Sequence, residues 1–262
     1  MMLHRIRALA CLVGLLAGMA CAGTPSDDAL VVSAADESRA RSHQSVGTNH
    51  LREGRVALAI RELRAAEQLN PRDEWIQLTL AEAYRLKGLT AEAESHLLKA
   101  LEIDPEFQSA HLTLSGLYIQ MGRYEEAMTH AQLLEDDPTF PKPWQALTNK
   151  GWALMQLDRH KEARQALELA LDYHDRYWRA QLNLGILDAE EGRRLDAMER
   201  FDRVLGLGPG PLARAEANFR MAEIYISLGN RDRAVEHLVA ASAERPNGTW
   251  GKRSEDTLER LR

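Results

Sequence analysis

Residues 74–107, EWIQLTLAEAYRLKGLTAEAESHLLKALEIDPEF, form the unit that decides the fold of this chain. Their pattern predicts two antiparallel helices, with Gly88 in the turn after the first. A small residue, Ala81, stands where the two helices approach closely. Pro105 ends the second helix, because proline cannot continue the hydrogen-bond ladder from inside a helix. One such hairpin cannot bury its own apolar face, so it needs copies on either side.

The copies are present along most of the chain. Six units with the same spacing of small, apolar and turn residues occupy residues 40–73, 74–107, 108–141, 144–177, 178–211 and 215–248. The spacing of Leu80, Ala81 and Tyr84 resembles the tetratricopeptide repeat, a helix–turn–helix unit of about 34 residues. The resemblance implies an all-α, right-handed superhelical solenoid of six such repeats. Residues 249–262 suit a final helix that caps the last apolar face.

Composition and charge exclude several classes of protein. The chain has 262 residues and a net charge of −6, which argues against a nucleic-acid binder, since such proteins present a basic face. Its two cysteines, Cys11 and Cys21, both lie in the N-terminal apolar region. We therefore expect no disulfide framework and no cysteine-based zinc site downstream of them.

The sequence contains no recognisable catalytic signature. The phosphate-binding loop, the zinc-protease motif and the serine-hydrolase motif are all missing from it. The glycine-rich residues 206–210 follow a predicted helix rather than a strand, so a helix-ending turn is the better interpretation. The nine histidines are scattered over different repeats. We expect a protein that is not an enzyme, with no catalytic residue, no metal, no cofactor and no small-molecule substrate.

The first twenty residues have the pattern of a secretory signal, with a basic start followed by the apolar residues 8–20. This apolar run is too short for a permanent membrane span. Two processing outcomes remain open. Residues 18–21, Gly-Met-Ala-Cys, resemble the lipobox of bacterial lipoproteins and predict lipidation of Cys21, although Gly18 stands where that motif usually has Leu. Residues 20–22 instead fit the A-x-A cleavage rule and predict a soluble periplasmic protein.

Lipidation of Cys21 is the interpretation that we prefer, because a cysteine ends the apolar run of a chain that has none downstream. Several acyl chains on one cysteine would give a stable anchor. Ala22, rather than Asp, follows the cysteine, which is typical of lipoproteins sorted to the outer membrane, facing the periplasm. Residues 21–39 are mostly small and polar, and they predict a flexible tether between the anchor and the repeats.

The first helices of stacked repeats line the concave side, and helical phase predicts which side chains project into that groove. The predicted groove residues are Trp75, Leu78, Arg85, Leu112, Ile119, Trp152, Met155, Leu182, Ile186, Phe219 and Ile226. This apolar and aromatic lining suits an amphipathic helix or an extended apolar peptide. Packing between neighbouring repeats is the alternative role for any one of these residues. For Trp75 and Trp152 together we expect an exposed binding stripe, since exposed aromatics cost solubility unless they are used.

A second resemblance concerns the whole layout. A lipoprotein-like signal, a short tether and six repeats resemble the PilF/PilW/Tgl group of type IV pilus biogenesis lipoproteins. The more specific part is the proline-rich break at residues 140–144, FPKPW, which leads into residues 148–152, TNKGW, of the fourth repeat. The sequence of residues 243–251, near the C-terminus, resembles the Tgl branch of this group most.

This resemblance implies a pilotin, a lipoprotein of the outer membrane. Its groove would bind the secretin PilQ and promote the localisation of the secretin and its assembly into multimers. The alternative is a general membrane-tethered periplasmic adaptor for cell-envelope enzymes or export machinery, because the repeats themselves occur in many adaptors.

Overall fold

The computed structural model describes residues 32–261, and within this range it contains only helices, turns and irregular segments. The helices are α1 (Ala34–Arg52), α2 (Val56–Leu69), α3 (Glu74–Leu86), α4 (Thr90–Ile103), α5 (Gln108–Met121), α6 (Tyr124–Glu135), α7 (Pro143–Gln156), α8 (His160–Tyr173), α9 (Trp178–Glu190), α10 (Arg194–Gly206), α11 (Pro211–Ser227), α12 (Arg231–Glu244) and α13 (Thr249–Leu261). The predicted signal, Cys21 and the first part of the predicted tether lie outside the described residues.

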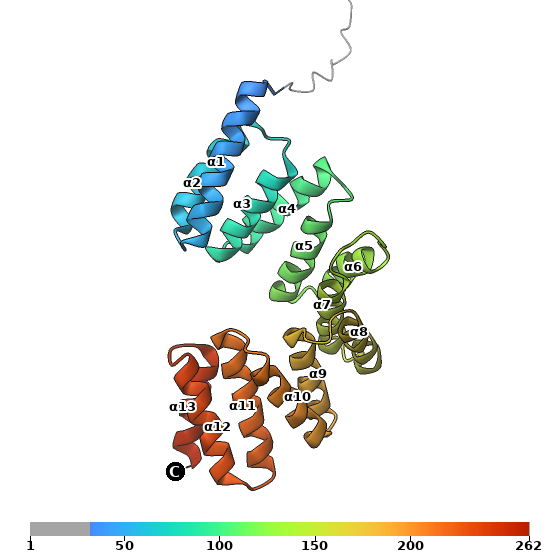
Figure 1. The fold of residues 1–262 in the computed structure, drawn as a ribbon, viewed down its shortest axis with the longest axis vertical. Coiled ribbons are helices and arrows are strands. Elements are labelled where there is room, and N and C mark those ends of the chain that lie inside the picture. The colour runs from blue at the N-terminus through green and yellow to red at the C-terminus, as the bar shows by residue number, and fades with distance from the viewer. Residues whose placement is uncertain (1–31, 262) are drawn as a thin grey trace, which may run out of the picture.

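Consecutive helices pair into six hairpins, α1–α2 to α11–α12, that follow one another along a C-shaped arc (Figure 1). First helices of neighbouring repeats also contact each other: α5 packs against α7, and α7 packs against α9. The helix α13 covers the last hairpin: Trp250, Leu258 and Leu261 pack on its apolar core. The predicted all-α fold of six stacked hairpins with a capping helix is therefore confirmed.

Small residues let the two helices of a hairpin approach closely, as the repeat pattern predicts. Ala81 is almost completely buried in this position. In the fourth repeat a Cβ atom on Gly151 would lie 2.6 Å from Leu167 Cγ, and in the fifth one on Gly185 would lie 2.7 Å from Phe201 Cε1. A side chain at either position would force Leu167 or Phe201 to shift, so glycine gives the closest approach of the two helices in these repeats.

The turn inside each hairpin uses a left-handed residue. Gly88 has a φ of +80°, and glycines in four other repeats have similar values. The fourth repeat places Asp158 there, with a φ of +57°. Aspartate tolerates this conformation better than most residues, because its short polar side chain can bond locally. The turn geometry is therefore kept although the glycine is not.

A polar pair recurs inside the hairpins, formed by residues nineteen positions apart on the two helices. The pairs are His43–Glu62, Gln77–His96, His111–His130, Gln181–Arg200 and Asn218–His237. Burial lowers the pKa of His96 and His237, and that of His130 to about 4. These imidazoles are therefore neutral at pH 7 and act as hydrogen-bond partners within the repeats.

The structure corrects the boundary of the predicted tether. Helix α1 begins at Ala34, so residues 34–39 belong to the first repeat and not to a flexible segment. The Ser33 hydroxyl accepts a hydrogen bond from the Asp36 N–H, and Asp36 and Glu37 complement the positive end of the helix dipole. A strong helix start was therefore hidden in a stretch of small polar residues.

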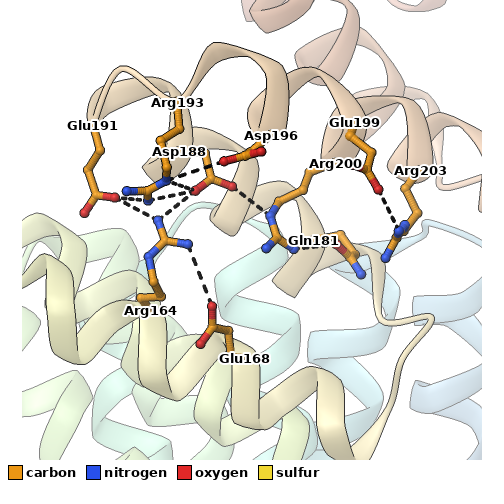
Figure 2. Close-up of polar contacts among 10 residues, drawn as sticks. All are labelled: Arg164, Glu168, Gln181, Asp188, Glu191, Arg193, Asp196, Glu199, Arg200 and Arg203. Atoms are coloured by element: carbon orange, nitrogen blue, oxygen red, sulfur yellow. Dashed lines mark hydrogen bonds and ion pairs between the residues drawn. The ribbon is translucent and has the colours of Figure 1, made fainter.

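A buried ionic cluster joins α8, α9 and α10 (Figure 2). Asp188, whose side chain is only 1% exposed, accepts hydrogen bonds from Arg164 at 2.7 Å, from Arg193 at 2.8 Å and from Arg200 at 2.7 Å. Glu191 pairs with Arg164 and Arg193, and Arg200 also donates to Gln181. The cluster therefore connects the fourth repeat to both helices of the fifth.

Asp188 stands where three other repeats have a tyrosine. The equivalent residue is Tyr84 in the second repeat, Tyr118 in the third and Tyr225 in the sixth. Tyr84 accepts a hydrogen bond from Arg64, and Tyr118 donates one to Glu94. The fifth repeat thus replaces a packed phenol by a carboxylate that holds three guanidinium groups.

Candidate protein-binding groove

A groove of about 540 Å³ runs along the concave side of the arc. It is lined by residues from α3, α5, α7, α9 and α11, so the first helices of five consecutive repeats contribute to it. Its walls combine apolar side chains with carboxamides, hydroxyls and a few charges. Such a surface suits a polypeptide segment, which presents apolar side chains and main-chain polar groups together.

Six of the eleven predicted groove residues line this groove. They are Arg85, Leu112, Ile119, Trp152, Leu182 and Ile186. Leu182 and Ile186 are also almost completely buried, so each packs in the hydrophobic core and forms part of the groove floor. The predicted binding role of these six side chains stays a prediction.

The prediction was wrong about the position of Leu78 and Met155. Leu78 is 7% exposed and Met155 is 4% exposed, and both belong to the hydrophobic core. Each lies one helical turn or less from a true groove residue, and that small rotation is enough to turn the side chain toward neighbouring helices. Packing between repeats, the alternative role considered for these residues, is what the structure shows.

Trp75 and Trp152 do not form one binding stripe. Trp75 is 51% exposed, but it leans edge-on against Phe107, with ring centroids 4.8 Å apart, and does not line the groove. Trp152 does line the groove, where it is half-buried. The two tryptophans therefore have different environments, which makes Trp75 a useful control for Trp152.

The predicted groove positions of Phe219 and Ile226 are also wrong, because α13 lies against this part of α11. Phe219 is 3% exposed, its ring lies 5.3 Å from that of Trp250, and the Arg253 guanidinium lies over it. Phe219 and Ile226 line a separate, smaller hollow between α11 and α13. The capping helix thus removes the last repeat's apolar residues from the groove.

Several groove residues were not predicted from the sequence. They include Thr113, Gly116, Gln120, Asn149, Tyr177, Trp178 and Asn183. Asn149 and Asn183 occupy the same position in consecutive repeats, a regularity that aligning the repeats would have shown. Gly116 leaves the groove open, because the nearest atom to a Cβ there would be Asn149 Nδ2 at 3.9 Å.

The two carboxylates that line the groove, Glu82 and Glu216, each lie near an arginine. Burial raises the pKa of the Glu82 carboxyl, and Arg85 partly opposes that shift. Burial likewise raises the pKa of Glu216, which lies 3.8 Å from Arg220. Across residues 32–261, no group of three or more His, Cys, Asp or Glu side chains is placed to hold a metal ion.

Comparison with known proteins agrees with this architecture. Two sequence profiles described as tetratricopeptide repeat match residues 87–151 with 188–250, and residues 47–106 with 150–211. Together these matches run without a gap from residue 47 to residue 250. The chain therefore belongs to the tetratricopeptide-repeat family.

Within that family the chain is similar to type IV pilus proteins. It is 32% identical to the type IV pilus assembly protein PilF of Pseudomonas aeruginosa over 139 residues, which are 52% of this chain and 53% of PilF. The solved structure of Pseudomonas aeruginosa PilF superposes with a TM-score of 0.69 at 18% identity, covering 85% of this chain and 99% of that one. That of PilW, described as a widely conserved type IV pilus biogenesis factor, superposes with a TM-score of 0.71 at 21% identity, covering 81% and 96%.

These similarities have a defined extent. The chain spans about half, or less, of the length of the curated relatives that it matches. The likeness to the two solved structures concerns the fold. In the described part of the chain, no helix is both long enough and apolar enough to cross a membrane.

Proposed function

We propose that this protein acts in type IV pilus biogenesis as a pilotin, binding a subunit of the outer-membrane secretin PilQ in its concave groove. The groove is the observation that carries the proposal, because it offers apolar and polar contacts along five first helices. The similarity to PilF supports the pilus context. The protein would shield apolar secretin surface until the ring closes, and this role requires no catalytic step.

Lipidation of Cys21 is part of the same proposal. A lipid anchor would hold the groove at the periplasmic face of the outer membrane, where secretin rings assemble. Several acyl chains on one cysteine give stable anchoring, whereas a single chain gives marginal binding. Support for this step comes from the sequence pattern at residues 18–21.

Deletion of the gene tests the proposal. We expect the heat-resistant secretin multimers seen by gel electrophoresis to be lost, while secretin monomer is still made. A copy of the intact gene should restore the multimers. Normal multimers and normal pili in the deletion strain would contradict the pilotin role and would favour the membrane-tethered adaptor.

A further inference from the structure

A second hollow, here called the α9–α11 pocket, opens beside the groove. It has a volume of about 440 Å³, within the range of pockets that hold small ligands, roughly 300–1,000 Å³. Its apolar wall is formed by Trp178, Leu182, Pro211, Leu212 and Ala213. Leu212 is 52% exposed, so this part of the apolar wall is accessible to a ligand.

The α9–α11 pocket exists because the chain departs from its repeat length. The predicted repeats leave residues 212–214 as an insertion between the fifth and sixth units. In the structure these residues extend α11, which begins at Pro211 and has 17 residues where most first helices have 13 or 14. The extension brings Leu212 and Ala213 opposite Trp178 at the start of α9.

The pocket is continuous with the groove. Trp178, Arg179, Leu182 and Glu216 line both of them. The pocket is also open to solvent, so it is accessible to a segment that lies in the groove. A side chain of such a segment would enter the pocket while the main chain remained in the groove.

The charges around the pocket differ in how they are neutralised. Glu244 is held by Arg214 through two hydrogen bonds of 2.7 and 2.6 Å. Glu216 is opposed by Arg220 and Arg253. In contrast, neither Arg179 nor Arg245 has an ion-pair partner among residues 32–261, and the Arg179 guanidinium lies 5.1 Å from the centre of the Trp178 ring. The uncompensated charge at the rim is therefore positive, next to an apolar wall.

We propose that the α9–α11 pocket receives a bulky apolar side chain of the bound partner segment, and that Arg179 and Arg245 bind the carboxylate of an adjacent Asp or Glu in that segment. The inference rests on the proposed function in taking the groove as the place where the segment lies. It adds the chemistry of the segment: an apolar residue beside an acidic one. The apolar wall provides the burial, and the two arginines provide the charge complementarity.

Blocked dipeptides test this chemistry without the secretin. The probes are N-acetyl-Phe-Asp-amide, its neutral counterpart N-acetyl-Phe-Asn-amide, and N-acetyl-Phe-Asn with a free C-terminal carboxylate. Binding is followed by NMR through the indole N–H signal of Trp178, which is assigned by its loss in Trp178→Phe. We expect the Asp probe to bind about fivefold more tightly than the Asn amide, as two partly exposed ion pairs would give.

Variants of the pocket complete the test. The double variant Arg179→Gln, Arg245→Gln should bring the ratio of the two affinities to about one. Leu212→Glu should weaken binding of the Asp probe about tenfold or more, because it places a charge in the apolar wall. The matched control is Leu195→Glu, since Leu195 is 79% exposed on α10 and lies outside the pocket.

Three results would overturn the inference: equal binding of the Asp and Asn amides, unchanged binding in Leu212→Glu, or tighter binding of the free C-terminal probe than of the Asp probe. The last would identify the occupant as a chain terminus. If the dipeptide test fails but gene deletion still abolishes the secretin multimers, only the assignment of the pocket is wrong. Normal multimers on deletion, with the dipeptide preference intact, would instead remove the pilotin role.

Discussion

Replacement of Asp188 by Ala is expected to lower the free energy of unfolding by about 3 kcal/mol. The substitution removes the one carboxylate that accepts from Arg164, Arg193 and Arg200. The three guanidinium groups would then keep Glu191, which bridges Arg164 and Arg193, and the longer contacts of Glu168 and Asp196, while Arg200 would keep no carboxylate among the described residues. The arginines are 22–40% exposed and retain some water, which places the cost at the low end for a broken buried ion pair.

Chemical denaturation followed by circular dichroism measures this effect. The matched control is Glu199→Gln, which removes an ion pair to Arg203 between side chains that are 72% and 54% exposed, on the same helix α10. Exposed pairs contribute about 0–1 kcal/mol, so this variant should behave almost as the wild type. A loss of less than about 1 kcal/mol for Asp188→Ala would show that the cluster does not hold the fourth and fifth repeats together.

The second large effect concerns partner binding. Trp152→Ala should weaken binding of the purified secretin subunit about 30-fold, which corresponds to the roughly 2 kcal/mol of an interface hot spot. Trp152 is half-buried in the groove wall and offers a large aromatic face to a bound segment. Because it also packs on the core of the fourth repeat, the variant should lose some thermal stability as well.

A groove-filling variant separates binding from folding. Gly116→Phe adds a large side chain where the nearest atom is 3.9 Å from the new Cβ, so it should fill the groove without disturbing the core. Replacing a glycine inside a helix also favours helix formation by a few tenths of a kcal/mol. We therefore expect weaker binding at unchanged or slightly higher stability.

Trp75→Ala is the matched control, because Trp75 is an exposed tryptophan outside the groove. Titration calorimetry with the secretin subunit and thermal melts of all three variants are the measurements. Binding that is lost in Trp75→Ala but kept in Gly116→Phe would place the partner on another surface.

The fold followed from local signals in the sequence. Each hairpin contains its own sequence signals, such as Gly88 in the turn and Ala81 where the helices approach closely. Residues of these types recur at a constant spacing along the chain. The helix start at Ala34 was missed, since Ser33 and Asp36 look like ordinary tether residues without their cap geometry. Repeat proteins are predictable to this extent because each unit contacts mainly its neighbours.

The groove was less predictable, for physical reasons. Helical phase separates a groove residue from a core residue by a small rotation, which is why Met155 was misplaced beside Trp152. Phe219 is buried because α13 packs over it, and the sequence around Phe219 contains no signal of this contact. The Asp188 cluster draws on three helices, so its partners could not be paired from spacing alone.

The central claim, that the concave groove holds the secretin, is tested most directly by site-specific photo-crosslinking in cells. A photoreactive phenylalanine analogue is placed at Asn149 in the groove or at Leu195, which is 79% exposed on α10 outside the groove. The account predicts a crosslink to the secretin from position 149 and none from position 195. A crosslink from position 195 alone, or from neither position while multimers still form, would contradict it.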